Sequence, residues 1–198
     1  MTARRLGPWV IDEELGRGGM GCVYLAHREP ADGAPARAAV KVLAAELATE
    51  AGFQERFQRE IDILSQLDHP HIVRFYESDI TDGRYWYAME HVPGPSLEEV
   101  REKRGRLPWQ EVLDVALQVT PALKHAHDRG IIHRDIKPSN LLRVEAGEAA
   151  GTVKLTDFGI ARLFASNHMT VTGAVVGTAE YLSPEQAMGK PVTKRSDL

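Results

Sequence analysis

The sequence is short of several features, and each absence excludes a class of protein. A single cysteine, Cys22, rules out an intramolecular disulfide and is typical of a reducing compartment. No apolar run approaches the roughly eighteen residues of a membrane span. The basic residues near the N-terminus are not followed by an apolar segment, so we expect no secretory signal. The formal net charge of −4 gives no electrostatic reason to expect nucleic-acid binding.

What is present is typical of a soluble globular protein. Hydrophobic residues make up 43% and charged residues 26% of the 198 residues, a length that suits one domain or two small lobes. The sequence has no internal repeats or low-complexity tracts. These features predict a cytoplasmic location and no membrane segment, while an anchor encoded in a longer parent chain stays open.

The first half of the chain is predicted to be mainly strands. A helix is expected at 51–67, where Phe53, Phe57 and Ile61 recur at four-residue spacing. Glu60 lies three residues after Phe57, on the same face, and a carboxylate there needs a partner. Gly83 ends a tight turn between two further strands. The predicted strands cover residues 9–11, 22–26, 38–43, 72–78 and 84–89.

The second half is predicted to be helical and then irregular. Residues 91–95 (HVPGP) are typical of a hinge, and Ser96 with Glu99 three residues later predicts a capped short helix. A longer helix is expected from about residue 109 to 128, although Pro121 inside it should bend it. Residues 131–198 are predicted to be mostly loop, and long loops are usually functional.

A glycine-rich run, GRGGMGCV, occupies residues 16–23 and fits the spacing G-x-G-x-x-G-x-V. Glycines there let backbone amides approach phosphate groups without a side chain in the way. Dinucleotide-binding turns carry similar glycines but continue into a helix, whereas residues 22–25 favour a strand. No P-loop pattern occurs. The run on its own leaves a plain glycine-rich hairpin open.

Two charged residues follow in the predicted strand and helix. Lys41 ends the tripeptide AVK at 39–41, and Glu60 lies nineteen residues later. A surface lysine and a solvated glutamate are the usual fate of such residues. The inward face predicted for Glu60 favours an ion pair instead.

The most specific motif is HRDIKPSN at residues 133–140, followed by DFG at 157–159. Together they place a carboxylate, a lysine and two oxygen ligands suited to Mg²⁺ in one stretch of chain. This combination resembles eukaryotic-like Ser/Thr protein kinases, and the wording YLSPEQ at 181–186 resembles the bacterial members.

The resemblance implies an α+β, two-lobed protein-kinase-like fold. Residues 1–90 would form a small antiparallel β lobe with one helix, and residues 91–198 part of a mainly helical large lobe. It implies an enzyme that transfers the γ-phosphoryl group of ATP to Ser or Thr hydroxyls of protein substrates, with Mg²⁺ or Mn²⁺ as the metal. Self-association for autophosphorylation is a further expectation.

The resemblance also assigns roles to residues of this sequence. Asp135 would orient the attacking hydroxyl, and Lys137 would neutralise the transferring phosphoryl group. Lys41 would contact the α- and β-phosphates and pair with Glu60, and Asn140 and Asp157 would hold the metal. His133 would pack under the DFG turn rather than act as a base. The residues expected around ATP, in addition to Lys41, are Leu15, Gly16, Gly18, Gly21, Val23, Ala39, Met89, Glu90, Val92 and Leu142.

Regulation and substrate choice are implied in the same way. Arg134 before the catalytic aspartate marks kinases that are switched by phosphorylation of the activation loop, and Thr170 and Thr172 are the candidate acceptors. Lys137 and Thr178 match the Ser/Thr-directed members and fit a protein substrate. The His69/His71 and His125/His127 pairs are weak candidates for metal ligands.

The last residues, 196–198, resemble the start of the family's central large-lobe helix, in which Asp197 would brace the HRD loop. The rest of that lobe is not in the sequence, so we expect the isolated chain to be poorly stable. Two alternatives to an active kinase stay open. The chain could be a truncated, non-catalytic nucleotide-binding or interaction fragment of a kinase, or a small-molecule phosphotransferase, which Lys137 and Thr178 disfavour.

Overall fold

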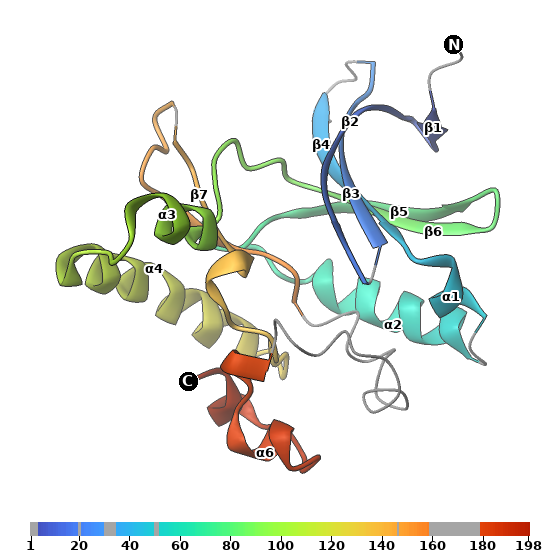
Figure 1. The fold of residues 1–198 in the computed structure, drawn as a ribbon. Helices are drawn as coiled ribbons and strands as arrows, with labels where there is room; N and C mark the ends of the chain where they lie inside the picture. Colours follow the sequence, from blue (N-terminus) through green and yellow to red (C-terminus); the bar gives the residue numbers. More distant parts are fainter. Residues whose placement is uncertain (1–3, 20, 30–34, 50–51, 146, 159–178) are drawn as a thin grey trace. The chain divides into compact units, whose positions relative to one another are not determined.

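The structure is a computed structural model that describes residues 4–19, 21–29, 35–49, 52–145, 147–158 and 179–198. The chain forms two compact units. The first contains Met1–Gln66 and Arg74–His91, and the second contains Leu67–Val73 and Val92–Leu198. Figure 1 labels the elements of both units.

The first unit is built on an antiparallel sheet of six strands in the order β1-β2-β3-β4-β6-β5. The three strands predicted before residue 44 are present as β2, β3 and β4, while β1 was not predicted. The turn at Asp82 and Gly83 closes the β5–β6 hairpin, and both residues have the positive φ that such a turn requires. The strand bounds are Arg5–Leu6 (β1), Trp9–Gly18 (β2), Gly21–His27 (β3), Arg37–Leu43 (β4), Phe75–Thr81 (β5) and Arg84–Met89 (β6).

One face of this sheet carries a hydrophobic core centred on two fully buried tryptophans, Trp9 and Trp86. Arg28 lies over the Trp9 ring and donates to Glu77, which also accepts from Trp9 Nε1. This ion pair covers the edge of the core at Trp9. The other buried members of the core are Leu6, Tyr24, Ala26, Ala38, Val40, Val42 and Ala88.

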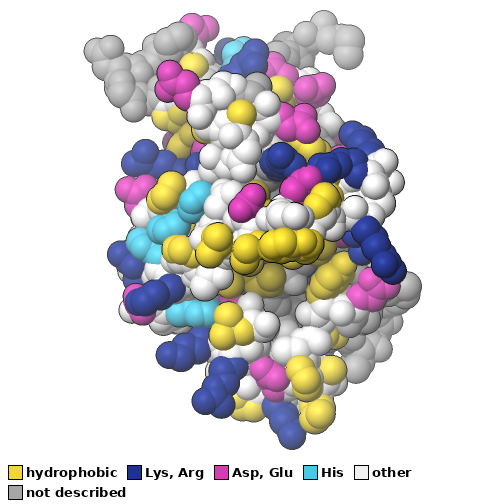
Figure 2. Space-filling model, turned by 90° about the vertical axis from the view of Figure 1, so that its left-hand side faces the viewer, with side chains coloured by type: hydrophobic (Ala, Val, Ile, Leu, Met, Phe, Trp, Pro, Cys, Tyr) yellow, Lys and Arg dark blue, Asp and Glu magenta, His cyan; other side chains and the backbone are white. Residues whose placement is uncertain are grey.

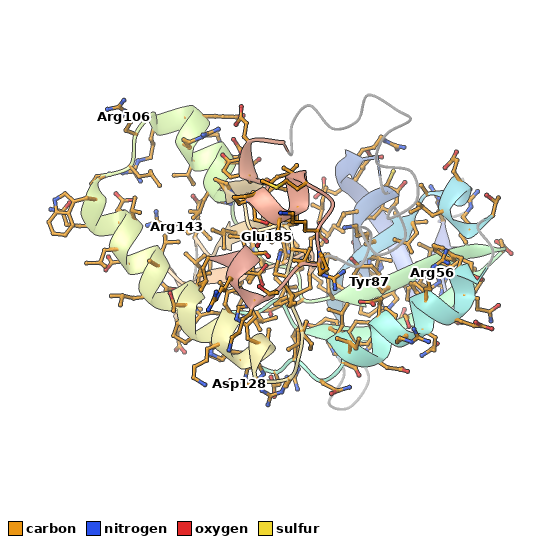
Figure 3. All side chains as sticks on the ribbon, turned by 90° about the horizontal axis from the view of Figure 1, so that it is seen from below. Arg56, Tyr87, Arg106, Asp128, Arg143 and Glu185 are labelled. Carbon is orange, nitrogen blue, oxygen red and sulfur yellow. The ribbon has the colours of Figure 1, made fainter. Side chains whose placement is uncertain are left out.

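Helix α2, Phe53–Leu64, packs against strand β6 through aromatic rings. The Tyr85 ring lies edge-on to Phe53 and Phe57, with centroids 4.8 Å and 5.2 Å apart. Ile61 is buried on the same face, as the spacing predicts. Figure 3 shows the helix from below, with Arg56 labelled on it. A short helix, α1 at Ala45–Ala48, precedes it and was not predicted.

The second unit is built around two helices and a two-stranded sheet. Helix α3, Leu97–Arg104, begins with the predicted capping box, because Ser96 Oγ accepts from Glu99 N and the Glu99 carboxylate accepts from Ser96 N. Helix α4, Trp109–His127, packs against β8. The remaining elements are β7 (Leu141–Arg143), β8 (Val153–Leu155), α6 (Pro184–Ala187) and the 3₁₀ turns η1 (Pro138–Asn140), η2 (Ala179–Tyr181) and η3 (Lys194–Asp197).

Helix α4 buries only part of its length. Its C-terminal half is buried through residues such as Leu123 and Ala126, whereas Trp109 is 70% and Leu117 64% exposed. Figure 2 shows hydrophobic side chains gathered across one face of the molecule. None of the helices in the described part of the chain combines the length and the apolar character needed to cross a membrane.

The strand predicted at 72–78 is shorter in the structure, because β5 begins only at Phe75 and Ile72 and Val73 belong to the segment Leu67–Val73 of the second unit. Val73 N donates to Leu155 O at 2.9 Å, and Leu155 N donates to His71 O at 2.9 Å. His71 Nδ1 also lies 2.9 Å from Val153 O. These bonds commit the segment to β8 in the second unit, so it cannot continue β5.

Candidate active site

The glycine-rich run forms the β2–β3 hairpin of the first unit. Gly21 has φ +133°, and a Cβ on it would lie 2.0 Å from the Val42 carbonyl oxygen, so the fold itself requires glycine there. At Gly16 and Gly18 a Cβ would meet nothing within 4 Å. No described atom of the protein would therefore clash with a side chain at Gly16 or Gly18. Glycine at these positions instead leaves room for a ligand to approach the backbone.

Lys41 lies in the centre of this sheet, on β4. It pairs with Val23 of β3 and Tyr87 of β6, and it is only 8% exposed. Burying an ammonium group costs free energy unless anionic or polar groups surround it. Glu60 is half-buried on α2 in the same unit.

The other first-unit residues expected around ATP differ in burial. Ala39 is buried and pairs with Met89, whereas Leu15 is 45% exposed. Val23, Met89 and Glu90 are half-buried. The Glu90 amide donates to Arg74 O at 2.8 Å.

In the second unit the HRDIKPSN segment brings three of its predicted catalytic and metal-binding residues together. Lys137 Nζ lies 2.9 Å from Asp135 Oδ2. Asn140 Nδ2 donates to the Asp135 backbone oxygen at 2.7 Å and to Oδ2 at 3.2 Å. Two donors on one carboxylate oxygen fix the orientation of the Asp135 side chain.

Asp197 braces the backbone of this loop, as the resemblance implies. Its side chain is fully buried, and its two oxygens accept from Arg134 N at 2.7 Å and from His133 N at 2.8 Å. His127 Nε2 lies 2.8 Å from Asp197 Oδ2 as well. The brace matters because Arg134 has φ +69°, a left-handed conformation that costs roughly 1–2 kcal/mol in a residue with a side chain.

His133 is structural, as predicted. Its buried ring lies 4.6 Å from the Phe158 ring, measured between centroids. Its Nε2 lies 2.9 Å from the Thr156 carbonyl oxygen, which can only accept, so Nε2 carries the proton. Nδ1 then accepts from Asp135 N at 3.2 Å. Burial lowers the pKa of His133, and the neutral ring with both nitrogens bonded has no lone pair left for proton transfer.

Asn140 and Asp157 lie at the same end of the β7–β8 sheet. Asn140 directly precedes β7, Asp157 follows β8 by two residues, and Thr156 N donates to Asn140 O at 3.0 Å. Since the Asn140 amide nitrogen is bonded to Asp135, its side-chain oxygen is the group available to a cation. Asp157 has φ +56°, a further strained position beside the site.

This donor set fits Mg²⁺ held mainly by a ligand's phosphates. Across the described ranges, no group of three or more His, Cys, Asp or Glu side chains could hold a metal ion, and the histidine pairs form no such group. Mg²⁺ keeps several waters and needs only one or two protein carboxylates when phosphates supply the rest. An amide oxygen and one carboxylate match that pattern.

Two predicted ATP-binding residues belong to the second unit. Val92 is buried, and Leu142 is half-buried on β7, where it forms a bridge with Ser96. The backbone just after Val92 packs closely against the residue after Leu142, because a Cβ on Gly94 would lie 1.9 Å from Arg143 O. Thr170, Thr172, Thr178 and Gly159 lie outside the described residues.

The sequence reasoning missed one residue at this site. Gln186 Nε2, on α6, donates to the Arg134 carbonyl oxygen at 2.8 Å. Its neighbour Glu185, labelled in Figure 3, accepts a hydrogen bond from Ser196 Oγ. A capping box at Ser183 and Gln186 is visible in the sequence as S-x-x-Q and could have drawn attention to the glutamine.

The chain resembles known protein kinases over nearly its whole length. Residues 9–198 match the model of the protein kinase domain. The chain is 41% identical over 192 residues to the serine/threonine-protein kinase PrkC of Bacillus subtilis, covering 97% of this chain and 28% of PrkC. It is 42% identical over 188 residues to PknJ of Mycobacterium tuberculosis, covering 95% of this chain and 31% of PknJ.

A solved structure agrees with these relatives. The kinase domain of Mycobacterium tuberculosis PknI superimposes with a TM-score of 0.76 and 32% identity, covering all of this chain and 71% of that domain. The chain spans about three tenths of the length of the curated relatives PrkC and PknJ. The sheet of six antiparallel strands and the HRD loop braced by Asp197 are consistent with these matches. The chain belongs to the protein kinase domain family, among the bacterial Ser/Thr kinases.

Proposed function

We propose that this chain is the catalytic part of a protein Ser/Thr kinase that transfers the γ-phosphoryl group of ATP to Ser or Thr hydroxyls. The observation that carries the proposal is the contact of Lys137 and Asn140 with one oxygen of Asp135, in a loop that Asp197 holds. A loop with a purely structural role does not require a half-buried lysine and carboxylate beside a buried amide in this arrangement.

Asp135 is the residue that would interact with the acceptor hydroxyl of the substrate. Its Oδ2 is occupied by two donors, so its side chain is fixed before a substrate arrives, and it orients the hydroxyl and receives its proton. Lys137, 2.9 Å from that oxygen, supplies positive charge for the phosphoryl group in transfer. Because the transition state of phosphoryl transfer is loose, this positioning and charge outweigh acid–base work.

Asn140 and Asp157 would hold Mg²⁺, which would supply positive charge to offset the charge of the phosphates. Asn140 would use its side-chain oxygen, since its nitrogen is bonded to Asp135. The strained φ of Asp157 turns the chain directly after Thr156, whose backbone is bonded to both His133 and Asn140.

The nucleotide contacts follow from the first unit and residues 92–142. Gly16, Gly18 and Gly21 would let backbone amides reach the phosphates, and Lys41, positioned by Glu60, would contact the α- and β-phosphates. Backbone groups of Glu90 and of Val92 are proposed as hydrogen-bond partners of the adenine, with apolar side chains for its ring. The apolar residues proposed for it are Leu15, Val23, Ala39, Met89 and Leu142. We assign the nucleotide-binding lobe to 1–90 and the remainder to 91–198.

Regulation would act through Arg134. Phosphorylation of Thr170 or Thr172 adds nearly two negative charges that a guanidinium can pair with, which would order the segment around Thr178 for a protein substrate. Self-association would allow one copy to phosphorylate another. A cytoplasmic location for this domain is part of the proposal, since ATP is supplied inside the cell.

The test is transfer of the γ-phosphate to a generic protein substrate, with Asp135→Asn as the matched control. The substitution changes one oxygen to an amide nitrogen and keeps the side-chain shape. We expect transfer by the natural sequence and a loss of roughly 10²–10⁴-fold in the variant. Nucleotide binding without transfer in the natural sequence would refute the proposal in favour of a non-catalytic nucleotide-binding fragment.

A further inference from the structure

We infer that Gln186 is a positioning residue for phosphoryl transfer: its side-chain amide fixes the peptide that joins Arg134 to Asp135. The inference rests on the proposed function and adds to it a residue outside the HRDIKPSN and DFG motifs.

Both ends of the Gln186 amide are bonded. Nε2 donates to the Arg134 carbonyl oxygen at 2.8 Å, and Oε1 accepts from Ser183 N at 3.1 Å. Turning the amide over would set oxygen against oxygen and nitrogen against nitrogen, so its orientation is fixed. The residue is half-buried, which protects these bonds from water.

The peptide that Gln186 grips is held on its other side by His133. The plane joining Arg134 to Asp135 contains the Arg134 carbonyl and the Asp135 amide. Gln186 donates to the carbonyl, and the amide donates to His133 Nδ1 at 3.2 Å. Rotation of this plane would turn the Asp135 side chain away from its position, and it is opposed from both sides.

The backbone at this point needs such support. Arg134 has φ +69°, and its own amide is bonded to Asp197 Oδ1 at 2.7 Å. Asp197 therefore holds the residue at its nitrogen and Gln186 holds it at its carbonyl oxygen. A conformation that a side chain disfavours persists only when its surroundings over-determine it.

The sequence offers a matched pair of substitutions. Gln186→Glu keeps the shape and keeps an acceptor for Ser183 N, but it sets a carboxylate oxygen against the Arg134 carbonyl. Ser183→Ala removes the hydroxyl that accepts from Gln186 N at 3.4 Å and leaves the Gln186 side-chain bonds in place. The first variant tests the grip on Arg134, and the second tests the cap of α6 alone.

We expect Gln186→Glu to lower kcat at least roughly tenfold at neutral pH, with the KM for ATP within about twofold, because a small misplacement of a reacting group is costly. The ratio of its kcat to that of the natural sequence should rise as the pH approaches the carboxyl group's ordinary range, since a protonated carboxyl can donate to Arg134. Ser183→Ala should keep kcat within about twofold throughout.

A third variant covers a failure of Gln186→Glu to fold. Gln186→Met removes the donor without adding charge, and we expect a smaller fall in kcat and a ratio that does not change with pH. An unchanged kcat in Gln186→Met, or in a folded Gln186→Glu, overturns the inference. So does an equal loss in Ser183→Ala, which would assign the effect to the helix cap.

Hydrogen exchange separates this inference from the proposed function. The amides of Arg134 and Asp135 should exchange faster in Gln186→Glu and Gln186→Met than in the natural sequence or Ser183→Ala, whether or not phosphate is transferred. If the natural sequence transfers no phosphate, the proposed function fails, and the exchange rates still decide the positioning. Equal exchange in all four chains overturns it.

Discussion

Asp197 Oδ1 accepts the backbone amide of Arg134 at 2.7 Å, across 63 residues of sequence. The carboxylate is fully buried and accepts from the backbone amides of His133 and Arg134 and from the His127 ring. Its three donors fix the loop that carries Asp135, so the geometry of the proposed catalytic residue depends on a side chain at the far end of the chain.

Replacing Asp197 with alanine should therefore destabilise the protein strongly. The substitution removes the acceptor of the buried His133 amide and of the partly buried Arg134 amide, and each lost bond to a charged group costs about 1.5–3 kcal/mol. We expect the free energy of unfolding to fall by roughly 3–5 kcal/mol, measured by urea unfolding. Asp197→Asn retains one acceptor and should lose less. Equal stability of the alanine variant and the natural sequence would contradict this account of the loop.

Loss of the Asp135 carboxylate and loss of the Asp157 carboxylate should lower turnover to different extents. General-base help is worth roughly 10²–10⁴-fold, whereas alignment can contribute about 7–11 kcal/mol. We therefore expect Asp157→Ala, which removes a metal ligand, to lower turnover at least as much as Asp135→Ala. Single-turnover phosphate transfer at saturating Mg²⁺ and ATP measures both. A clearly more active Asp157→Ala would show that orienting the hydroxyl dominates.

Thr170 and Thr172 are predicted to become phosphorylated when the protein is incubated with ATP and Mg²⁺. Mass spectrometry of an active preparation should find phosphate on one or both. Replacing both by alanine should reduce activity towards protein substrates, and Arg134→Ala should remove the benefit of phosphorylation, because the phosphate then lacks its partner. An active preparation with both threonines unmodified excludes this regulation.

Stability should decrease in mildly acid solution through a cluster of histidines. The His69 ring lies 5.3 Å from His125 and 5.7 Å from His71, and burial, followed by these two neighbours, lowers the pKa of His69. The unfolded chain, with a histidine pKa near about 6.5, binds more protons, so the free energy of unfolding falls as the pH drops below that value. At higher pH the contribution is fully present.

The comparison of Tm at about pH 7.5 and about pH 5.5 measures this effect. His125→Phe keeps a ring beside His69 and removes a neighbour that lowers the pKa of His69, so it should show a smaller fall in Tm than the natural sequence. His27→Phe is a control, because that exposed residue lies far along the sequence in the first unit and pairs with Asp12. An equal fall in the natural sequence and His125→Phe would exclude the cluster as the cause.

Local patterns in the sequence predicted much of this fold. The spacing of Phe53, Phe57 and Ile61 placed α2, and Ser96 with Glu99 placed the start of α3, since both signals act over one or two helical turns. The short elements β1 and α1 were missed because two to four residues carry no detectable period. Ile72 and Val73 were wrongly assigned to the strand at 72–78 because their partners on β8 are distant in sequence, and such an apolar pair suits either a strand or a buried loop.

The candidate site was predicted where chemistry dictates residue type and was missed where only geometry does. Lys137 and Asn140, which both contact Asp135, have a spacing that a phosphate reaction explains. Gln186 has a local explanation in its helix cap, and nothing in the sequence indicates that its other end reaches Arg134, 52 residues earlier. Contacts of a side chain with a distant backbone leave no residue pattern of their own.

The association of Leu67–Val73 with β8 bears on how the protein folds while a ribosome makes it. The six strands of the first unit are complete once His91 has emerged, but the carbonyl that His71 binds belongs to Val153, 82 residues after it. At a synthesis rate of about 5–20 residues per second, the apolar Ile72 and Val73 wait roughly 4–16 s for their partners. During that interval the apolar residues of this segment are exposed and can bind chaperones. Codons that slow translation between residue 71 and residue 153 would lengthen the exposure.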